Sequence, residues 1–155
     1  MSTIQIGKPA PSFTAQSTFG EISLAGYLGR GVVLYFYPKD NTPGCTTETQ
    51  DFRDCHDQFL AESCVVIGVS RDSLKSHENF SKKLELQFPL IADPEETLCE
   101  AYGVMKLKQM YGKQVRGIER STFLIDARGK LVQVWRGLKV PGHAQEVLQA
   151  ARSLT

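Results

Sequence analysis

The chain has 155 residues, of which 41% are hydrophobic and 23% are charged, and 18 basic against 17 acidic side chains leave a net charge of +1. A chain of this length can build a core without metal or disulfide support, so we expect a single domain over residues 1–155. The balanced charge argues against a nucleic-acid partner. No apolar run reaches the roughly 20 residues that a membrane-spanning helix needs, so no membrane association is expected.

Cysteine spacing and the start of the chain indicate a reducing compartment. Residues 1–5 lack the basic stretch and apolar run of a secretory signal, which favours a cytoplasmic protein. Cys45, Cys55, Cys64 and Cys99 are widely and irregularly spaced, unlike the cysteines of small disulfide-rich domains. No pair forms a C-x-x-C motif, which would indicate a zinc site or a redox dithiol. We therefore expect free thiols, no metal and no cofactor.

Strands and helices are predicted to alternate along the chain. Short alternating runs within the first 30 residues favour a small N-terminal hairpin, and two continuous β-branched and aromatic runs are typical of buried parallel strands. In chain order, we expect strands at 31–37, 64–70, 88–92, 117–126 and 130–136, and helices at 43–63, 73–84, 94–102 and 143–154. Residues 104–117 are polar with weak periodicity, and we expect no regular structure there.

The order of these elements indicates the fold class. Consecutive strand–helix–strand units require parallel pairing, because the crossover helix carries the chain back to the same end of the sheet. The turn at Asp126-Ala127-Arg128-Gly129 instead joins two antiparallel strands. The sequence thus predicts an α/β, thioredoxin-like fold with a mixed central sheet flanked by helices.

One segment carries chemical information. Residues 37–48 read Tyr-Pro-Lys-Asp-Asn-Thr-Pro-Gly-Cys-Thr-Thr-Glu and connect a buried strand to a helix. Pro43 suits the first helical position and Thr42 the N-cap, which places Cys45 in the first turn. Free amides and the helix dipole stabilise a thiolate there, and such sites can lower a thiol pKa to about 3.5–7.5. Gly44 leaves room beside the sulfur. Without further context, an inert small residue at a helix start is the favoured interpretation of Cys45.

The string Pro-Lys-Asp-x-Thr-Pro-Gly-Cys-Thr-x-Glu at 38–48 resembles the peroxiredoxins, most closely the bacterioferritin comigratory protein subfamily, also called peroxiredoxin Q. The resemblance extends over nearly the whole chain, including residues 7–13, 32–37, 66–71 and 120–126. It implies a thiol-dependent peroxidase that reduces hydrogen peroxide and organic hydroperoxides through a cysteine sulfenic acid. The implied partners are a hydroperoxide substrate and a thiol reductant.

The resemblance also implies roles for individual residues. Cys45 matches the peroxidatic cysteine, Thr42 the hydroxyl that orients the peroxide, and Pro38 the shield of the pocket. Arg120 matches the active-site arginine, and a fixed guanidinium suits a reaction in which negative charge grows on a leaving oxygen. Without the resemblance, Arg120 reads as a surface charge at the end of a strand.

The sequence also predicts positions for the remaining polar residues. Glu48 is either an acid on the helix surface or an anchor for an arginine, and we favour the anchor. We expect Gly44 and Glu48 beside the substrate. Lys39 and Asp40 read as solvated loop charges. The histidines are expected to be exposed or half-buried helix residues: His56, His77 and His143.

The resolving cysteine is the main departure from the subfamily. Its usual positions are empty, because Gln50 stands at one and the helix at 73–84 contains no cysteine. Cys55 lies about 15 Å along the same helix from Cys45, whereas a disulfide needs Cα atoms about 4.4–6.8 Å apart. Cys99 is a further candidate, although core burial is its favoured interpretation.

We therefore predict a one-Cys mechanism in which thioredoxin, or alternatively glutaredoxin or glutathione, reduces the enzyme. The alternative is a two-Cys mechanism in which the helix unwinds locally and Cys55 resolves the sulfenic acid. A thioredoxin-like dithiol oxidoreductase is disfavoured by the missing C-x-x-C motif. A non-enzymatic holdase is disfavoured because it would not need the Thr-Pro-Gly-Cys motif at Cys45. We expect a monomer or a weak homodimer, because no long exposed apolar stripe is evident.

Overall fold

The computed structural model describes residues 4–154, except for the side chain of Met110. The strands are β1 (Thr14–Ser17), β2 (Gly20–Ser23), β3 (Gly31–Phe36), β4 (Cys64–Ser70), β5 (Leu90–Ala92), β6 (Met105–Met110), β7 (Lys113–Ile118), β8 (Ser121–Ile125) and β9 (Leu131–Arg136). The helices are α1 (Pro43–Ala61), α2 (Leu74–Leu84), α3 (Thr97–Ala101), α4 (His143–Arg152) and the short 3-10 turn η1 (Ala25–Tyr27). Across the described residues, none of these helices is long and apolar enough to cross a membrane.

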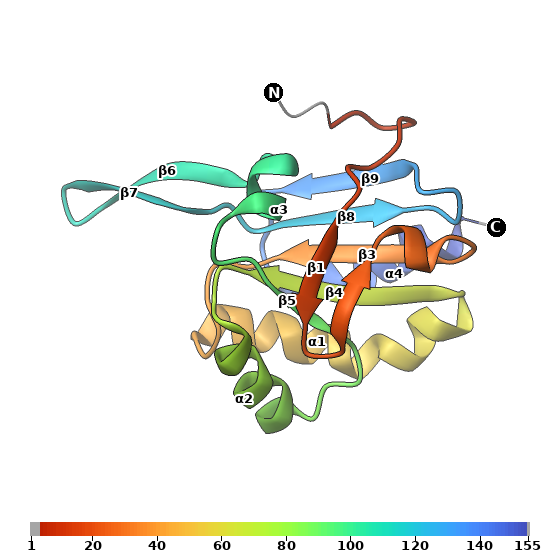
Figure 1. Ribbon diagram of the computed structural model, residues 1–155, viewed down its shortest axis with the longest axis horizontal. Helices are drawn as coiled ribbons and strands as arrows, with labels where there is room; N and C mark the ends of the chain where they lie inside the picture. The colour runs from red at the N-terminus through yellow and green to blue at the C-terminus, as the bar shows by residue number, and fades with distance from the viewer. Residues whose placement is uncertain (1–3, 155) are drawn as a thin grey trace.

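A seven-stranded mixed sheet forms the centre of the protein, in the order β2-β1-β5-β4-β3-β8-β9 (Figure 1). β3 pairs with β4, and β4 with β5, in parallel. β8 runs antiparallel to β3 and β9 antiparallel to β8, while the β1–β2 hairpin joins the sheet through β5. The predicted mixed sheet and the N-terminal hairpin are both confirmed.

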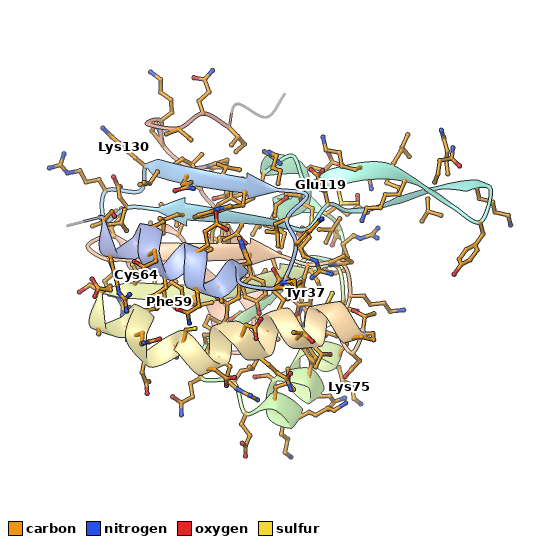
Figure 2. The ribbon with its side chains drawn as sticks, turned by 180° about the vertical axis from the view of Figure 1, so that it is seen from behind. Tyr37, Phe59, Cys64, Lys75, Glu119 and Lys130 are labelled. Atoms are coloured by element: carbon orange, nitrogen blue, oxygen red, sulfur yellow. The ribbon has the colours of Figure 1, made fainter. Side chains whose placement is uncertain are left out.

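The sheet separates two hydrophobic cores. All six residues of β3 are buried, because side chains on both of its faces are covered. Val33 and Tyr35 pack on the face covered by α1, α2 and α4, which is the side seen in Figure 2. Leu34 and Phe36 pack on the opposite face, which α3 and the N-terminal segment cover. This double burial explains why the strand reads as an unbroken apolar run.

Helix α1 begins as the sequence predicts. Pro43 is its first residue and Thr42 is the N-cap. Phe52 and Phe59 lie on its buried side and pack against the sheet. The helix follows directly on the loop after β3, so its first turn lies at the edge where the parallel strands end, which is where binding sites gather in α/β folds.

The prediction of irregular structure at 104–117 is wrong. β6 and β7 form an antiparallel hairpin, a separate two-stranded sheet that projects from the body of the protein (Figure 1). Its turn residues, Tyr111 and Gly112, both have positive φ angles, 54° and 77°, as in a type I′ turn. Leu107 and Val115 are exposed, so no buried face imposes the hydrophobic alternation by which strands are recognised.

The predicted strand at 117–126 is in fact two strands. Ile118 ends β7 in the projecting hairpin, and Ser121 begins β8 in the main sheet. The chain changes sheets between them, where the Glu119 amide donates to the Val104 carbonyl at 2.7 Å. Arg120 therefore lies at the junction of the two sheets rather than inside a strand.

Candidate active site

Cys45 and Arg120 meet at the edge of the sheet. Cys45 lies in the first turn of α1 and is 1% exposed. Phe36 at the end of β3 pairs with Ser121 at the start of β8, which sets Arg120 beside the loop that leads into α1. As a result, Arg120 Nη2 lies 3.5 Å from Cys45 Sγ although the two residues are far apart in the sequence.

Glu48 holds the other side of the guanidinium. It lies three residues after Cys45, on the same side of α1, and it is 1% exposed. Arg120 Nη1 donates to Glu48 Oε1 at 2.6 Å, so the favoured anchor interpretation is confirmed. Burial raises the pKa of Glu48 to about 7, although the nearby guanidinium opposes the shift. Its second oxygen, Oε2, is buried and has no hydrogen-bond partner among the described residues.

Arg120 keeps its positive charge in this setting. Burial acts to lower its pKa, but Glu48 and Cys45 act in the opposite direction, and the net result is a pKa above its ordinary value. The planar guanidinium therefore presents one nitrogen to a carboxylate and another to a sulfur, and it has no acceptor capacity of its own. It is a fixed cation beside a buried thiol.

The remaining motif residues surround this pair. Thr42 is half-buried, and its hydroxyl donates to the Lys39 carbonyl at 2.8 Å rather than capping an amide of α1. Pro38 is half-buried directly after β3. Gly44 borders the guanidinium, because a Cβ at this position would lie 3.3 Å from Arg120 Nη2.

Cys55 occupies a different environment in the same helix. Gln145 Nε2 of α4 lies 3.2 Å from its sulfur. Burial raises the pKa of Cys55, and the neighbouring carboxylates of Asp51 and Asp54 raise it further. Ten residues of continuous helix separate it from Cys45, so no disulfide between them is possible while α1 is intact.

The other two cysteines belong to the core, and all four cysteines are free thiols. Burial raises the pKa of Cys64, at the start of β4, to about 11. Burial and the nearby Asp93 carboxylate also raise the pKa of Cys99. Cys99 packs on the face of the sheet opposite to Cys45. It lies in the core, as its favoured interpretation predicted.

The predicted exposure of two groups of polar residues is wrong. Asp40 is not a solvated loop charge: it is 4% exposed and bonds to Tyr37 and His77. The histidines are buried rather than exposed or half-buried, at 8%, 0% and 3% exposure for His56, His77 and His143. No local pattern signals this burial, because the groups that satisfy Asp40 and His77 come from separate segments of the chain.

His143 also lies near the site. Its Nε2 is 2.8 Å from the hydroxyl of Thr122, two residues beyond Arg120 in the chain. Burial lowers the pKa of His143 to about 4; Glu146 opposes this and the charge of Arg120 adds to it. The ring is therefore neutral at physiological pH.

Comparison with known proteins identifies the family to which the chain belongs. The AhpC/TSA family matches residues 6–134. Peroxiredoxin Bcp from Bacillus subtilis strain 168 is 49% identical over 154 residues, which cover 99% of this chain and 98% of the relative. Peroxiredoxin Bcp from Xanthomonas campestris is 52% identical over 133 residues, which cover 86% and 83%. The chain belongs to the AhpC/TSA family of peroxiredoxins.

Solved structures agree with this assignment. Bacterioferritin comigratory protein from Xanthomonas campestris, studied for its alkyl peroxide reduction, matches this peroxiredoxin with a TM-score of 0.89 and 46% identity, covering 99% of this chain and 98% of that one. A cysteine-to-serine variant of PrxQ from Xylella fastidiosa matches with a TM-score of 0.92 and 43% identity, covering 99% and 98%. The predicted thioredoxin-like fold is confirmed. This peroxiredoxin is a thiol peroxidase, with a peroxide as substrate and a thiol as reductant.

Proposed function

We propose that Cys45 is the peroxidatic cysteine. Its thiolate attacks one oxygen of a hydroperoxide, the sulfur–oxygen bond forms as the oxygen–oxygen bond breaks, and the leaving oxygen takes a proton to become water or an alcohol. The observation that carries this assignment is the 3.5 Å separation of Cys45 Sγ and Arg120 Nη2 at the first turn of a 19-residue helix. The other three thiols have raised pKa values, and among the described residues Cys45 is the cysteine whose sulfur accepts a hydrogen bond from an arginine.

Arg120 is proposed to stabilise the transition state. Negative charge moves from the sulfur to the leaving oxygen, and the guanidinium already borders the sulfur, so its charge needs no reorganisation during the reaction. Glu48 fixes the orientation of Arg120 through the 2.6 Å contact. Since Glu48 Oε2 has no partner among the described residues, it is also suited to contact substrate, as the sequence predicted for Glu48.

Thr42, Pro38 and Gly44 are proposed to form the rest of the substrate site. The Thr42 hydroxyl donates its proton to the Lys39 carbonyl, which leaves its lone pairs to accept the peroxide O–H and thereby orient the substrate. Gly44 keeps the approach to Cys45 and Arg120 free of a side chain. Pro38, at the end of β3, would shield the pocket from water.

We further propose a one-Cys mechanism. A first external thiol condenses with the sulfenic acid and releases water, and a second thiol displaces Cys45 from the mixed disulfide. Thioredoxin fits this role, as do glutaredoxin with glutathione, and the protein is expected to act as a monomer or a weak homodimer. The alternative in which Cys55 is the resolving cysteine requires unwinding of α1, because both residues lie within that helix.

Trapping of the sulfenic acid tests the assignment of Cys45. Wild-type protein treated with one equivalent of hydrogen peroxide and dimedone should gain a single adduct on the peptide that contains Cys45, and C45S should consume peroxide no faster than buffer. C55S is the matched control, because it removes a buried thiol from the same helix, and it should retain wild-type consumption. Equal rates for C45S and wild type would contradict the proposal.

Peptide mapping without reductant tests the one-Cys mechanism. After oxidation in the absence of dimedone, no peptide pair joining Cys45 and Cys55 should appear. If such a pair forms in wild type and is lost in C55S, the two-Cys alternative is correct.

A further inference from the structure

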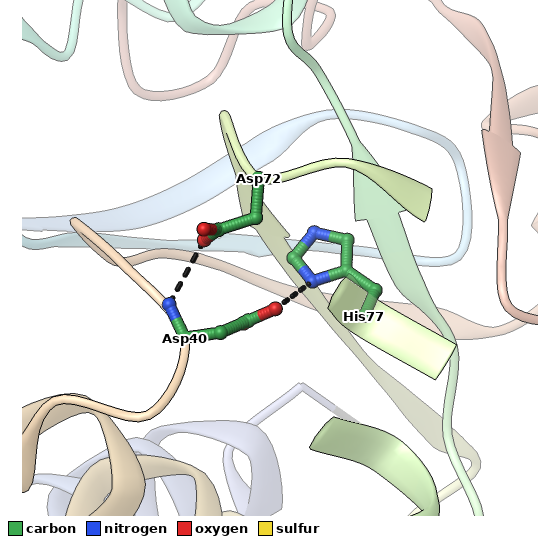
Figure 3. Close-up of side chains that lie close together, drawn as sticks. All are labelled: Asp40, Asp72 and His77. Atoms are coloured by element: carbon green, nitrogen blue, oxygen red, sulfur yellow. Dashed lines mark hydrogen bonds and ion pairs between the residues drawn. The ribbon is translucent and has the colours of Figure 1, made fainter. Parts of the chain in front are cut away.

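A buried polar cluster connects the active-site loop to helix α2. We define the Asp40 cluster as five residues from two regions of the chain: Tyr37, Asp40, Asp72, Ser76 and His77. Figure 3 shows Asp40 between the Asp72 carboxylate and the His77 ring. None of these residues is used in the peroxide chemistry described above.

Asp40 is held by four hydrogen bonds. Its backbone N–H donates to Asp72 Oδ2 at 2.9 Å, and its Oδ1 accepts the Tyr37 hydroxyl at 2.6 Å. Its Oδ2 accepts the Ser76 hydroxyl at 2.8 Å and lies 2.8 Å from His77 Nδ1. The four partners come from the end of β3, from the turn after β4 and from α2. A loop residue is thereby fixed to two rigid elements.

The His77 ring is held through both of its nitrogens. Nε2 lies 2.9 Å from the Ile91 carbonyl, which can only accept a hydrogen bond. Nδ1 lies 2.8 Å from Asp40 Oδ2. The His77 and Asp40 side chains are 0% and 1% exposed, so they form a buried hydrogen-bonded pair. Removing one partner leaves a buried polar group without its hydrogen bond, which destabilises the arrangement.

A metal ion is the other group that this cluster resembles. One ligand atom each from Asp40, Asp72 and His77 lies within 4.8 Å of the others. However, the oxygens that face each other are already engaged by N–H and O–H donors, and Nδ1 is paired with Asp40. A cation would have to displace these contacts, so the geometry favours a hydrogen-bonded cluster.

The cluster lies close to the nucleophile in the chain. Asp40 precedes Thr42 by two residues and Cys45 by five. Asn41 between them has a φ of 64°, a left-handed conformation that reverses the chain. Since Asn41, Pro43 and Gly44 are all exposed, Asp40 is the buried attachment of this stretch of the loop.

We propose that His77 is a positioning residue that acts through Asp40 to hold the loop at 38–44, and with it Cys45, in the position where the thiol meets Arg120. This inference rests on the proposed role of Cys45. If the contact between Asp40 and His77 is broken, the loop opens more often, the sulfur spends less time beside the guanidinium and the reaction with peroxide slows. The same opening exposes Cys45, which is 1% exposed in the closed state, so its reaction with bulky reagents accelerates.

The experiment compares H77Q with H56Q as its matched control. His56 is also a largely buried helix histidine, but its ring packs edge-on against Phe88 and lies outside the cluster. Three quantities are measured at constant pH: the rate constant for oxidation by hydrogen peroxide, the rate of alkylation of Cys45 by iodoacetamide in reduced protein, and hydrogen exchange of the amides at 38–46. In H77Q we expect peroxide oxidation about tenfold slower, and alkylation and local exchange about tenfold faster, the ratio that corresponds to about 1.4 kcal/mol. H56Q should change none of them.

A less disruptive variant keeps the proposal testable if H77Q does not fold. S76A removes one hydrogen bond to Asp40 and keeps its contact with His77, so it should shift all three quantities in the same directions by about two- to threefold, as expected for about 0.5 kcal/mol. If neither S76A nor a folded H77Q changes exchange at 38–46, the proposal is overturned. It is also overturned if all three rates fall together, or if added zinc changes them in wild type but not in H77Q.

The outcome is separable from the proposed function. If wild type and C45S consume peroxide equally, the role of Cys45 fails, whereas alkylation and hydrogen exchange still report whether the Asp40 cluster holds the loop. If wild type is active and H77Q retains both its peroxide rate and its closed loop, only the positioning role fails.

Discussion

Cys45 and Cys55 belong to the same helix, ten residues apart, and both are buried, yet their surroundings are opposite in charge. Cys45 meets the guanidinium of Arg120 at 3.5 Å, at the end of α1 where the helix dipole is positive. Cys55 meets an amide from Gln145 and two carboxylates in the middle of the helix, and its pKa is raised. Burial is therefore common to both thiols, and what distinguishes them is the charge around each sulfur.

The largest effect is expected from removing the cation beside Cys45. R120M deletes the charge beside Cys45 and should lower the rate constant for peroxide reduction by about 10²–10³-fold, the usual cost of losing one fixed donor to a developing oxyanion. R120K should recover part of this loss, because it restores charge without the planar fork. Stopped-flow measurement of peroxide consumption checks both variants. A rate for R120M within twofold of wild type would show that the guanidinium is not needed.

A second prediction concerns His143, a buried neutral group near Arg120. Its folded-state pKa of about 4 lies below its ordinary value of 6.5, because burial disfavours the charged ring. A depressed pKa contributes stability that is complete above pH 6.5 and is lost as the pH falls toward 4. Urea unfolding at pH 7 and at pH 4 should show wild type losing about 2 kcal/mol more stability than H143N. Equal losses would contradict the burial of a neutral ring.

Glu48, which contacts the Arg120 guanidinium, is the subject of the third prediction. E48Q keeps one acceptor for Arg120 but removes the carboxylate charge, so we expect the peroxide rate constant to fall by about tenfold, in the range of one lost charge-assisted hydrogen bond. D51N, a neutral replacement one turn closer to Cys55, should leave that rate unchanged. If both variants lower the rate equally, the effect belongs to the charge of the helix rather than to the contact with Arg120.

The smallest expected effect concerns Cys55. Asp51 and Asp54 add to the raised pKa of its thiol, so neutralising both should lower that pKa and increase the thiolate fraction near neutrality. In a C45S background, D51N/D54N should increase alkylation of Cys55 at pH 8 by about threefold, consistent with a shift of about half a pKa unit. Mass spectrometry of the Cys55 peptide measures this rate. No increase would leave burial as the only cause of its low reactivity.

The parts of this site that the sequence predicted are those governed by local rules. A proline and a threonine at the start of α1 locate Cys45 in the first turn without reference to the rest of the fold. The pairing of Arg120 with Cys45 depends on the register of β3 and β8, which no local pattern specifies, so its assignment came from resemblance to a family.

The parts that were missed depend on contacts between distant segments. Asp40 looks like a surface charge in the sequence, because the partners that bury it are contributed by α2 and by the turn after β4. The β6–β7 hairpin was missed for the opposite reason: it packs little of its surface on a core, so its residues carry no apolar alternation to reveal it.

The glycine at position 44 makes the distance between thiol and cation adjustable. Within 4 Å, a methyl group there would meet a single atom outside its chain neighbours and its own helix backbone, Arg120 Nη2, at 3.3 Å. Because this contact is tight and Glu48 holds the other side of the guanidinium, substitutions of increasing bulk would displace the guanidinium from the thiol by increasing amounts. A set of variants graded in this way would keep one scaffold and one thiol while the distance to the cation changes.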